Sequence, residues 1–391
     1  MPYAAIDPLP AGGDGVLNVA CFANQFADAQ GHGLARYARE LFSSLQELDC
    51  LRVTPVAGWS ALSPDVLDAR RREVGLKLTG LGRRGTSLLW TFLDFPTLES
   101  RLDARVDVVH AVSLGYPVAT RKPFVVTIHD LGPLTHPEFF GNTRPWVMKR
   151  SLDQAVRKAD AIVCVSQSTA DEVRDYVGPA VDGRLRVVLE GVSERFFAPA
   201  DPTLLAGLDL PPEDTPFILS AGAVSPRKNL HGLLSAMALA LDSIPHHLVL
   251  VGGDGWDGGQ FERMLETPAL RGRVHLTGYV SDGALRALYQ AAALYVHPSL
   301  YEGFGLPVLE AMASGTPVVS SDRTSLPEVV GSAGRLSDAA NPETLAGDIV
   351  AMCNAGERRA KIIQEGRAHA ARFRWPTCAR AMAEIYREVS C

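Results

Sequence analysis

Short apolar runs alternate with helical patterns along almost the whole of this 391-residue chain. Such runs, rich in Val, Ile, Leu and Phe, occur for example at residues 16–22, 124–130, 161–166 and 217–222. Strands that alternate with helices in this way build parallel sheets from βαβ units. The sequence therefore predicts an α/β fold with parallel sheets.

Composition limits the classes of protein to consider. This length favours two or three domains, and 47% hydrophobic with 21% charged residues is ordinary for a globular protein. The net charge of −6 argues against a general nucleic-acid binder. Six cysteines without a C-x-x-C pair indicate reduced thiols in the cytosol and no zinc site. Because we find no signal-peptide pattern and no apolar run of about 18 residues, we expect a cytoplasmic protein.

One glycine-rich stretch in the second half says most about function. Gly303 and Gly305 let the backbone turn tightly and bring bare amides close to a ligand. Pro307 suits the first turn of a helix, and a helix N-terminus after a glycine-rich turn is a ready anion site. Glu302 precedes the turn, and Glu310 lies about one turn inside the helix. Two carboxylates that flank an anion site suit a ligand with hydroxyls around its phosphates, such as a nucleotide sugar.

A second segment combines a glycine with two basic residues at a predicted helix start. Gly222 ends an apolar run, and the chain then reads Ala-Val-Ser-Pro-Arg-Lys-Asn-Leu, which contains Arg227 and Lys228. Amides and the dipole of a helix, together with two cationic side chains, suit a diphosphate.

Two predicted strands have a histidine at their carboxyl ends. Residues 106–110 end at His110, and residues 124–130 end with His129 and Asp130. Ligands of open α/β sheets bind outside the carboxyl ends of strands. Both histidines are therefore placed where a ligand could bind, and His129 is the one that matches the active-site histidine in the family resemblance described below, with Asp130 to hold its tautomer or orient an acceptor. A structural role explains His110 equally well.

Several of these segments together resemble one enzyme family. The run from Glu302 to Glu310 resembles the E-x7-E motif of the retaining glycosyltransferases of family 4, which have the two-domain GT-B fold. The segment around His129 and a G-x-G-x-x-R-Y run near the N-terminus are similar to that family as well. Family members carry a basic residue where this chain has Ala223. The Pro-Arg-Lys-Asn variant most resembles bacterial O-antigen type mannosyltransferases.

The resemblance implies a role for each matching residue. Glu310 would accept from the ribose hydroxyls and Glu302 from the transferred sugar, while Arg227 and Lys228 would neutralise the departing diphosphate. The expected catalytic residues are His129, Glu302, Lys228 and Arg227. The expected donor-binding residues are Gly31, Gly33, Gly222, Gly278, Tyr279, Val280, Phe304, Gly305, Leu306 and Glu310.

The resemblance also implies how the chain divides. Two Rossmann-like domains would face each other across a cleft, with residues 1–197 on the acceptor side and residues 217–374 on the nucleotide-sugar donor side. Residues 198–216 are rich in proline and acidic side chains, which is typical of an interdomain linker. Residues 375–391 would form a helix that crosses back to the N-terminal domain.

The function that the resemblance implies is a retaining, metal-independent glycosyl transfer. The enzyme would move a hexose, best mannose or a deoxyhexose from a GDP-sugar, to a growing, lipid-linked bacterial surface polysaccharide. The alternatives are a UDP-sugar-dependent enzyme of the same fold, a nucleotide-sugar epimerase or phosphorylase, and a non-catalytic nucleotide-sugar-binding partner. We find no D-x-D motif, so we expect no metal and no cofactor besides the nucleotide-sugar co-substrate.

Two further patterns have competing explanations. Residues 253–258 form a G-x-G-x-x-G after an apolar run, but the strand-like run about 20 residues later, 273–280, carries no acid, and the next one is Asp282, so we reject a dinucleotide site. Basic residues alternate with Leu, Trp and Phe at 70–92 and 144–150. This fits either peripheral contact with anionic lipids at the inner membrane or solvated helices with buried aliphatic stems.

Overall fold

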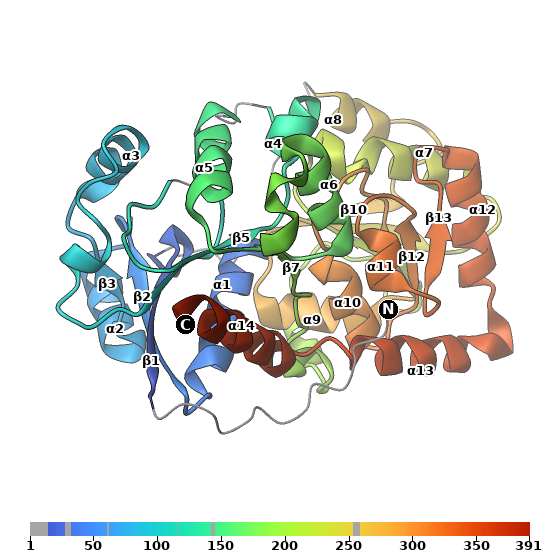
Figure 1. The fold of residues 1–391 in the computed structure, drawn as a ribbon. Helices are drawn as coiled ribbons and strands as arrows, with labels where there is room; N and C mark the ends of the chain where they lie inside the picture. Colours follow the sequence, from blue (N-terminus) through green and yellow to red (C-terminus); the bar gives the residue numbers. More distant parts are fainter. Residues whose placement is uncertain (1–14, 28–32, 61, 116, 142–144, 253–258) are drawn as a thin grey trace.

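The computed structural model describes residues 15–27, 33–60, 62–115, 117–141, 145–252 and 259–391. These residues form two lobes, each built on one parallel sheet with helices packed around it (Figure 1). The predicted fold class, α/β with two parallel-sheet domains, is confirmed.

Every strand pairs in parallel with its neighbours. The first sheet has the order β3-β2-β1-β4-β5-β6-β7, and the second has the order β10-β9-β8-β11-β12-β13. The strands are β1 Leu17–Phe22, β2 Leu51–Ala57, β3 Lys77–Leu78, β4 Val108–Ala111, β5 Phe124–Ile128, β6 Ala161–Cys164, β7 Leu185–Val187, β8 Phe217–Ala221, β9 His247–Val251, β10 Val274–Gly278, β11 Leu294–His297, β12 Val318–Ser321 and β13 Arg335–Ser337.

Polar caps and prolines place many of the helix starts. The Ser166 hydroxyl accepts from Thr169 N at 3.0 Å at the start of α6, and the Asn341 side-chain oxygen accepts from Thr344 N at 2.8 Å at the start of α12. The α-helices are α1 Gly33–Gln46, α2 Pro64–Val74, α3 Gly82–Phe92, α4 Gly132–Thr135, α5 Pro145–Lys158, α6 Gln167–Val177, α7 Leu230–Ala240, α8 Gln260–Leu265, α9 Asp282–Ala291, α10 Leu306–Ala313, α11 Leu326–Val330, α12 Pro342–Cys353, α13 Arg359–Ala370 and α14 Trp375–Ser390.

The first sheet ends at β7, Leu185–Val187, although the chain stays apolar beyond it. Further along, Val192 N donates to Phe373 O at 3.1 Å, so the chain leaves the sheet to pair with the segment before α14. A Cβ on Gly191 would overlap the backbone at Trp375, which explains the glycine at this close approach.

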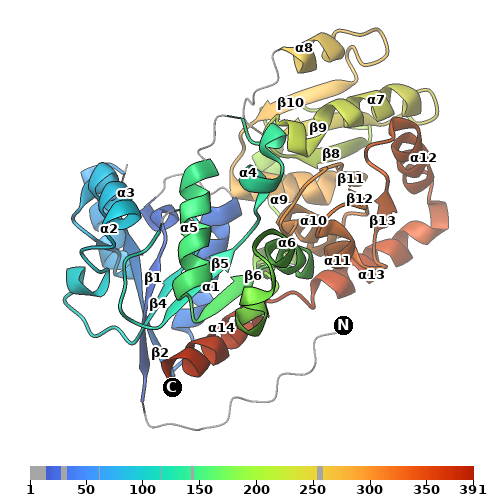
Figure 2. The ribbon, with the colours of Figure 1, turned by 45° about the horizontal axis from the view of Figure 1, so that its top comes forward.

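Helix α14 packs on the first domain, beside α1 (Figures 1 and 2). The Tyr386 hydroxyl lies 2.7 Å from His110 Nδ1, and His110 Nε2 lies 2.8 Å from the Thr127 hydroxyl. Burial lowers the pKa of His110 to about 3, so its imidazole stays neutral. His110 therefore has a structural role in fixing α14. One cluster of buried apolar residues continues from β1 through α14 and α10 into the second domain.

The basic and aromatic spans 70–92 and 144–150 divide between core and surface. Trp90 is buried, whereas the Phe92 side chain is 58% exposed. Arg144 lies outside the described residues. Within the described ranges, we find no helix that is both long and apolar enough to cross a bilayer.

Candidate active site

Two loops at the carboxyl ends of β8 and β11 lie side by side and hold the central charges. The first contains the short 3₁₀ turn Pro226–Lys228, which precedes α7, and the second runs from β11 to α10. Leu300 N donates to Arg227 O at 2.8 Å and joins the two loops. This is the edge of a parallel sheet where ligands bind.

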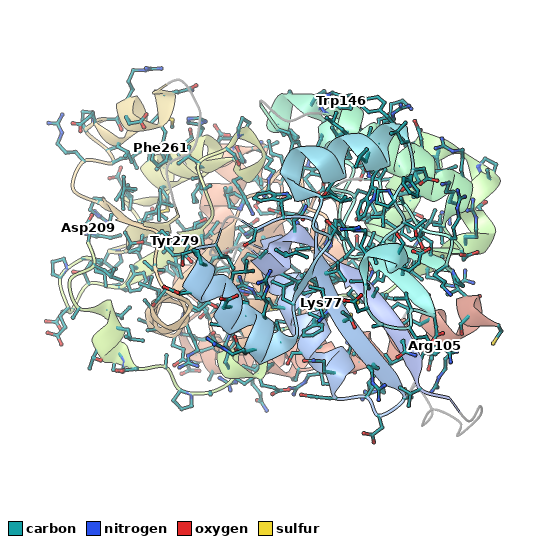
Figure 3. The ribbon with its side chains drawn as sticks, turned by 90° about the vertical axis from the view of Figure 1, so that its left-hand side faces the viewer. Lys77, Arg105, Trp146, Asp209, Phe261 and Tyr279 are labelled. Carbon is teal, nitrogen blue, oxygen red and sulfur yellow. The ribbon has the colours of Figure 1, made fainter. Side chains whose placement is uncertain are left out.

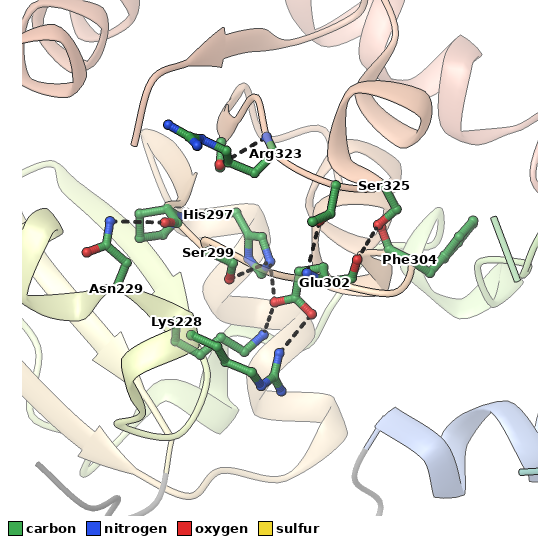
Figure 4. Close-up of polar contacts among 12 residues, drawn as sticks. Lys228, Asn229, His297, Ser299, Glu302, Phe304, Arg323 and Ser325 are labelled. Atoms are coloured by element: carbon green, nitrogen blue, oxygen red, sulfur yellow. Dashed lines mark hydrogen bonds and ion pairs between the residues drawn. The ribbon is translucent and has the colours of Figure 1, made fainter. Parts of the chain in front are cut away.

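Glu302 is the centre of this arrangement. Lys228 Nζ lies 2.6 Å from Glu302 Oε1, and Arg227 Nη1 lies 2.9 Å from Oε2. His297 Nε2 also lies 3.2 Å from Oε1. Figure 4 shows Lys228 and His297 pointing at the Glu302 carboxylate. The Glu302 side chain is only 11% exposed, so its carboxylate is buried among these three partners.

These contacts fix the charge of Glu302. Burial opposes ionisation, but the charges of Lys228 and Arg227 outweigh it and hold the pKa of Glu302 well below its usual range. Burial lowers the pKa of Lys228, and Glu302 partly offsets this effect. The Glu302 charge raises the pKa of Arg227. At neutral pH, Glu302 is therefore a carboxylate that can only accept hydrogen bonds.

The hydroxyls of Thr324 and Ser325, in the loop between β12 and α11, form hydrogen bonds with the backbone of Glu302 and Phe304. Glu302 N donates to Thr324 Oγ1 at 3.0 Å. The Ser325 hydroxyl lies 3.0 Å from Glu302 O and 2.7 Å from Phe304 O (Figure 4). A Cβ on Gly303 would overlap the carbonyl oxygen of His129 in the other domain, so this position needs glycine. The carboxylate is therefore held by its backbone as well as by its ion pairs.

The turn into α10 has the geometry expected from its glycines. Gly305 has φ 121° and precedes the helix, and Pro307 lies in the first turn, as predicted. Phe304 and Leu306 are buried, so their side chains pack into the protein and their predicted contribution to the donor site is confined to their backbone amides.

Glu310 is engaged by the opposite domain. Its side chain is 2% exposed, Arg36 Nη1 of α1 forms an ion pair with Oε1, and the Tyr289 hydroxyl donates to Oε2 at 3.3 Å. Arg36 Nη2 also lies 2.7 Å from Asp282 Oδ1. Burial opposes the charge of Arg36, but Glu310 and Asp282 outweigh it and raise the pKa of Arg36. A ribose at Glu310 must therefore share this carboxylate with Arg36 or displace it.

His129 follows β5, and both of its ring nitrogens face acceptors. Nδ1 lies 3.2 Å from Glu190 Oε1, and Nε2 lies 3.0 Å from Val112 O. The expectation that Asp130 holds the imidazole is wrong, because Asp130 Oδ1 accepts from Gly132 N at 3.0 Å and Glu190 is the partner. His129 itself faces the second domain through its backbone carbonyl at Gly303.

Two of the other predicted donor-binding positions, Gly222 and Gly278, lie at the carboxyl ends of β8 and β10 in the second sheet. Gly222 N donates to Val251 O at 2.8 Å, and Gly252 N donates to Gly278 O at 3.0 Å, so the ends of β8, β9 and β10 are adjacent. Tyr279 is 62% exposed after β10 (Figure 3). The remaining positions are Val280, partly buried beside Tyr279, Gly33, exposed at the start of α1, and Gly31, which lies outside the described residues.

Sequence reasoning missed several residues that complete the site. Arg36 stood inside the G-x-G-x-x-R-Y run without a role, and His297 is simply the last residue of β11. Glu190 and Asp282 gave no local signal, because their partners are distant in the sequence. Within the described ranges, we find no group of three or more His, Cys, Asp or Glu that could hold a metal.

Comparison with known sequences connects this geometry to a family. Residues 31–196 match "Glycosyltransferase Family 4", and residues 209–369 match "Glycosyl transferases group 1". The chain is 33% identical over 369 residues to O-antigen chain mannosyltransferase B of Escherichia coli, an alignment that covers 91% of this chain and 96% of that protein. It is 38% identical over 219 residues to the serotype-specific mannosyltransferase WbdA of Escherichia coli, covering 53% of this chain and 26% of WbdA.

Solved structures show the same fold. The Anabaena Alr3699/HepE structure in complex with UDP-glucose superposes with a TM-score of 0.73 at 19% identity, covering 95% of this chain and 100% of that one. WaaG, a glycosyltransferase involved in lipopolysaccharide biosynthesis, superposes with a TM-score of 0.66 at 18% identity, covering 94% and 99%. The architecture is the GT-B fold that the sequence resemblance implies.

Proposed function

The chain belongs to the family 4 glycosyltransferases of GT-B fold, and from this premise we propose that it extends a bacterial surface polysaccharide with mannose from GDP-mannose. Family membership makes the protein a glycosyltransferase, while the donor, the acceptor and the stereochemistry belong to the proposal. Two mannosyltransferases among its relatives support mannose over other hexoses. A GDP-deoxyhexose is the next choice, and a UDP-sugar is the alternative that the experiment below would reveal.

The observation that carries the proposal is the ionised Glu302 between Lys228 and Arg227. When a donor binds, its diphosphate would approach these two cations, which stabilise the negative charge that develops as the leaving group departs. The carboxylate would then accept hydrogen bonds from hydroxyls of the transferred sugar. In this mechanism no metal is needed, because the cations and the amides at the α10 N-terminus supply the positive charge.

We place the acceptor attack on the same face as the departing diphosphate, so that the anomeric configuration is retained. Glu302 would orient the sugar and would not become glycosylated. Substitution Glu302→Gln keeps the shape but removes the charge, so kcat should fall by about 10²–10³ while donor affinity changes little. Glu357→Gln, an exposed glutamate in a distant turn, is the matched control. An inverted product by NMR, or a glycosyl–Glu302 adduct by mass spectrometry, would refute this mechanism.

The donor is best identified by thermal shift against GDP, UDP, GDP-mannose, GDP-rhamnose, UDP-glucose and UDP-GlcNAc, with and without EDTA. A ligand at 100 times its Kd adds about 2.7 kcal/mol of stability, which a thermal shift detects. We expect GDP compounds alone to raise the Tm, without an effect of EDTA, and Glu310→Ala to abolish the shift. Shifts with UDP compounds alone would discard the mannosyl assignment, and a shift that EDTA abolishes would discard the metal-independent mechanism.

We also propose that the first domain contacts anionic lipid on the cytoplasmic face of the inner membrane, where a lipid-linked acceptor would lie. Phe92, Leu93 and Phe95 are exposed beside α5, as is Trp146 at its start (Figure 3). The Arg150 guanidinium lies 5.2 Å from the Phe92 ring centre, so a cation accompanies this apolar surface. Exposed aromatic and basic residues together suit an anionic interface.

Flotation with phosphatidylglycerol vesicles tests this contact. The double variant Phe92→Ser, Trp146→Ser should lose vesicle binding, whereas Leu239→Ser, an exposed leucine on α7 of the second domain, should keep it. Equal binding of both variants would refute the membrane surface and leave the transfer reaction untouched.

A further inference from the structure

A cavity of about 730 Å³ opens between the two domains beside Glu302. The first domain lines it with α6 and the end of α4, and the second domain lines it with Tyr301, Thr324 and α11. Its volume is within the roughly 300–1,000 Å³ that is usual for small-molecule sites. It adjoins Glu302 from a side that Arg227 and Lys228 do not line.

The wall of this cavity is built from contacts that join the domains. The Tyr301 hydroxyl donates to Glu172 Oε2 at 2.7 Å and accepts from Leu131 N at 3.1 Å. Thr135 Oγ1 donates to Glu172 Oε1 at 2.7 Å. The His136 ring lies 5.1 Å from the Tyr301 ring. Because these partners come from both domains, the shape of the cavity depends on how the two domains are placed.

The chemistry of the lining excludes a nucleotide diphosphate. Besides Glu302, four carboxylates line the cavity, and no Lys or Arg is among the described lining residues. The nearby Arg174 forms ion pairs with Asp171 and Asp182, so it compensates the charge of Asp171, and the negative charge of the lining comes chiefly from the other three carboxylates. A phosphate would meet like charge here, whereas neutral hydroxyls can donate to the carboxylates. The carboxylates in question are Asp171, Glu172, Asp175 and Glu328.

The outer part of the cavity also offers an aromatic ring. Tyr176 on α6 is 41% exposed, and its neighbour Asp175 is exposed as well. An exposed ring next to hydrogen-bond acceptors is a mixed apolar and polar surface, which matches a pyranose with its C–H face and its hydroxyls.

Resting on the proposed glycosyl transfer, we infer that this cavity binds the growing end of the acceptor as an uncharged, hydroxyl-rich glycan and discriminates against phosphorylated or uronic-acid ends. The donor remains on the other side of Glu302, at Arg227 and Lys228. The terminal acceptor sugar then lies next to Glu302, and the preceding sugar lies over Tyr176 and Asp175. A specificity for neutral acceptors therefore follows from the charge of the cavity.

The test measures glycan binding rather than transfer. The full-length protein, with GDP present to fill the nucleotide site, is presented to an array of neutral α-linked manno- and gluco-oligosaccharides and their phosphorylated and uronic-acid counterparts. Calorimetry then gives the Kd of the best neutral oligosaccharide and, separately, of GDP. The variants are Tyr176→Ala, Asp175→Asn and Asp175→Lys, and the matched control is Asp214→Asn, an exposed aspartate of the segment 198–216.

We expect the wild type to bind neutral glycans in preference to anionic ones. Tyr176→Ala and Asp175→Asn should each weaken this binding by about 10-fold, with the Kd of GDP unchanged. Asp175→Lys should gain affinity for phosphorylated glycans, and the control should behave as the wild type. The exposed positions of both residues favour correct folding, which the Tm of each variant checks.

Three outcomes would overturn the inference: no glycan binding by the wild type, a preference for anionic glycans, or variants that weaken GDP binding instead of glycan binding. The proposed function fails separately. A protein that binds neutral glycans here but transfers no hexose would keep this inference and refute the transfer. Suppose instead that the protein transfers hexose and that neither Tyr176→Ala nor Asp175→Asn changes its glycan affinity. That result would keep the proposed transfer and refute this inference.

Discussion

The ion pair between Arg36 and Glu310 predicts that one substitution will weaken the fold and strengthen nucleotide binding. Arg36 belongs to α1 of the first domain, and Glu310 belongs to α10 of the second. The substitution Arg36→Met removes the guanidinium, which lies 5.8 Å from the Phe196 ring centre, and keeps an unbranched apolar side chain in its place. It therefore breaks the ion pair with a limited loss of packing.

The cost in stability can be worked out from burial. Removing one partner of a buried ion pair costs about 3–5 kcal/mol. Arg36 is 14% exposed, and the Tyr289 hydroxyl still donates to Glu310, so we take the lower end, about 3 kcal/mol. Unfolding entropy of about 2.1 cal/mol/K per residue gives about 0.8 kcal/mol/K for 391 residues. The Tm should therefore fall by about 4 °C.

Nucleotide affinity should change in the opposite sense. If Glu310 binds the ribose as we propose, a ribose hydroxyl must compete with Arg36 for this carboxylate in the wild type. In Arg36→Met this competitor is gone, so the Kd of the preferred nucleoside diphosphate should fall by about 10-fold, the equivalent of one hydrogen bond to a charged group. Calorimetry with GDP and UDP measures the Kd, and scanning calorimetry measures the Tm.

The control removes the other ion pair of Arg36 and leaves Glu310 as it is. Asp282 is 44% exposed, so Asp282→Asn should cost within about 1 kcal/mol and leave the Kd unchanged. Weaker nucleotide binding by Arg36→Met would refute the reasoning, because Arg36 would then be a ligand of the donor. An unchanged Tm would show that the pair adds no net stability.

Three further predictions concern other parts of the structure. Burial lowers the pKa of His110 from 6.5 to about 3, so the fold keeps it neutral while the unfolded chain protonates it below pH 6.5. The contribution of His110 to the free energy of unfolding is thus fully present above pH 6.5, and about 2 kcal/mol is lost between pH 7 and pH 5. Urea titrations of His110→Asn should not show this loss. Gly303→Ala places a methyl on the carbonyl oxygen of His129, so kcat should fall by about 100-fold and the nucleotide-bound protein should expand by small-angle scattering. Gly347→Ala, with open space around its Cβ, should change neither quantity. Glu190→Gln removes the carboxylate at His129 Nδ1 and should lower kcat by about 10-fold, with an unchanged nucleotide Kd.

The elements of this fold could be predicted because their signals are local. Ser166 caps α6 and Pro307 starts α10 through atoms only a few residues away. Apolar runs such as β5 and β8 are strands because parallel strands are buried on both faces. The E-x7-E motif marks Glu302 and Glu310 as site residues from the sequence alone.

The sequence by itself thus determined the fold class, the element order and the residues at the two loops. Only the tertiary structure decided what those residues touch. Glu302 meets Lys228 from 74 positions away, and Glu310 meets Arg36 from 274 positions away. Such pairs depend on how two sheets and two domains come together, because a charge is held by whatever lies nearest in space, which no local pattern encodes.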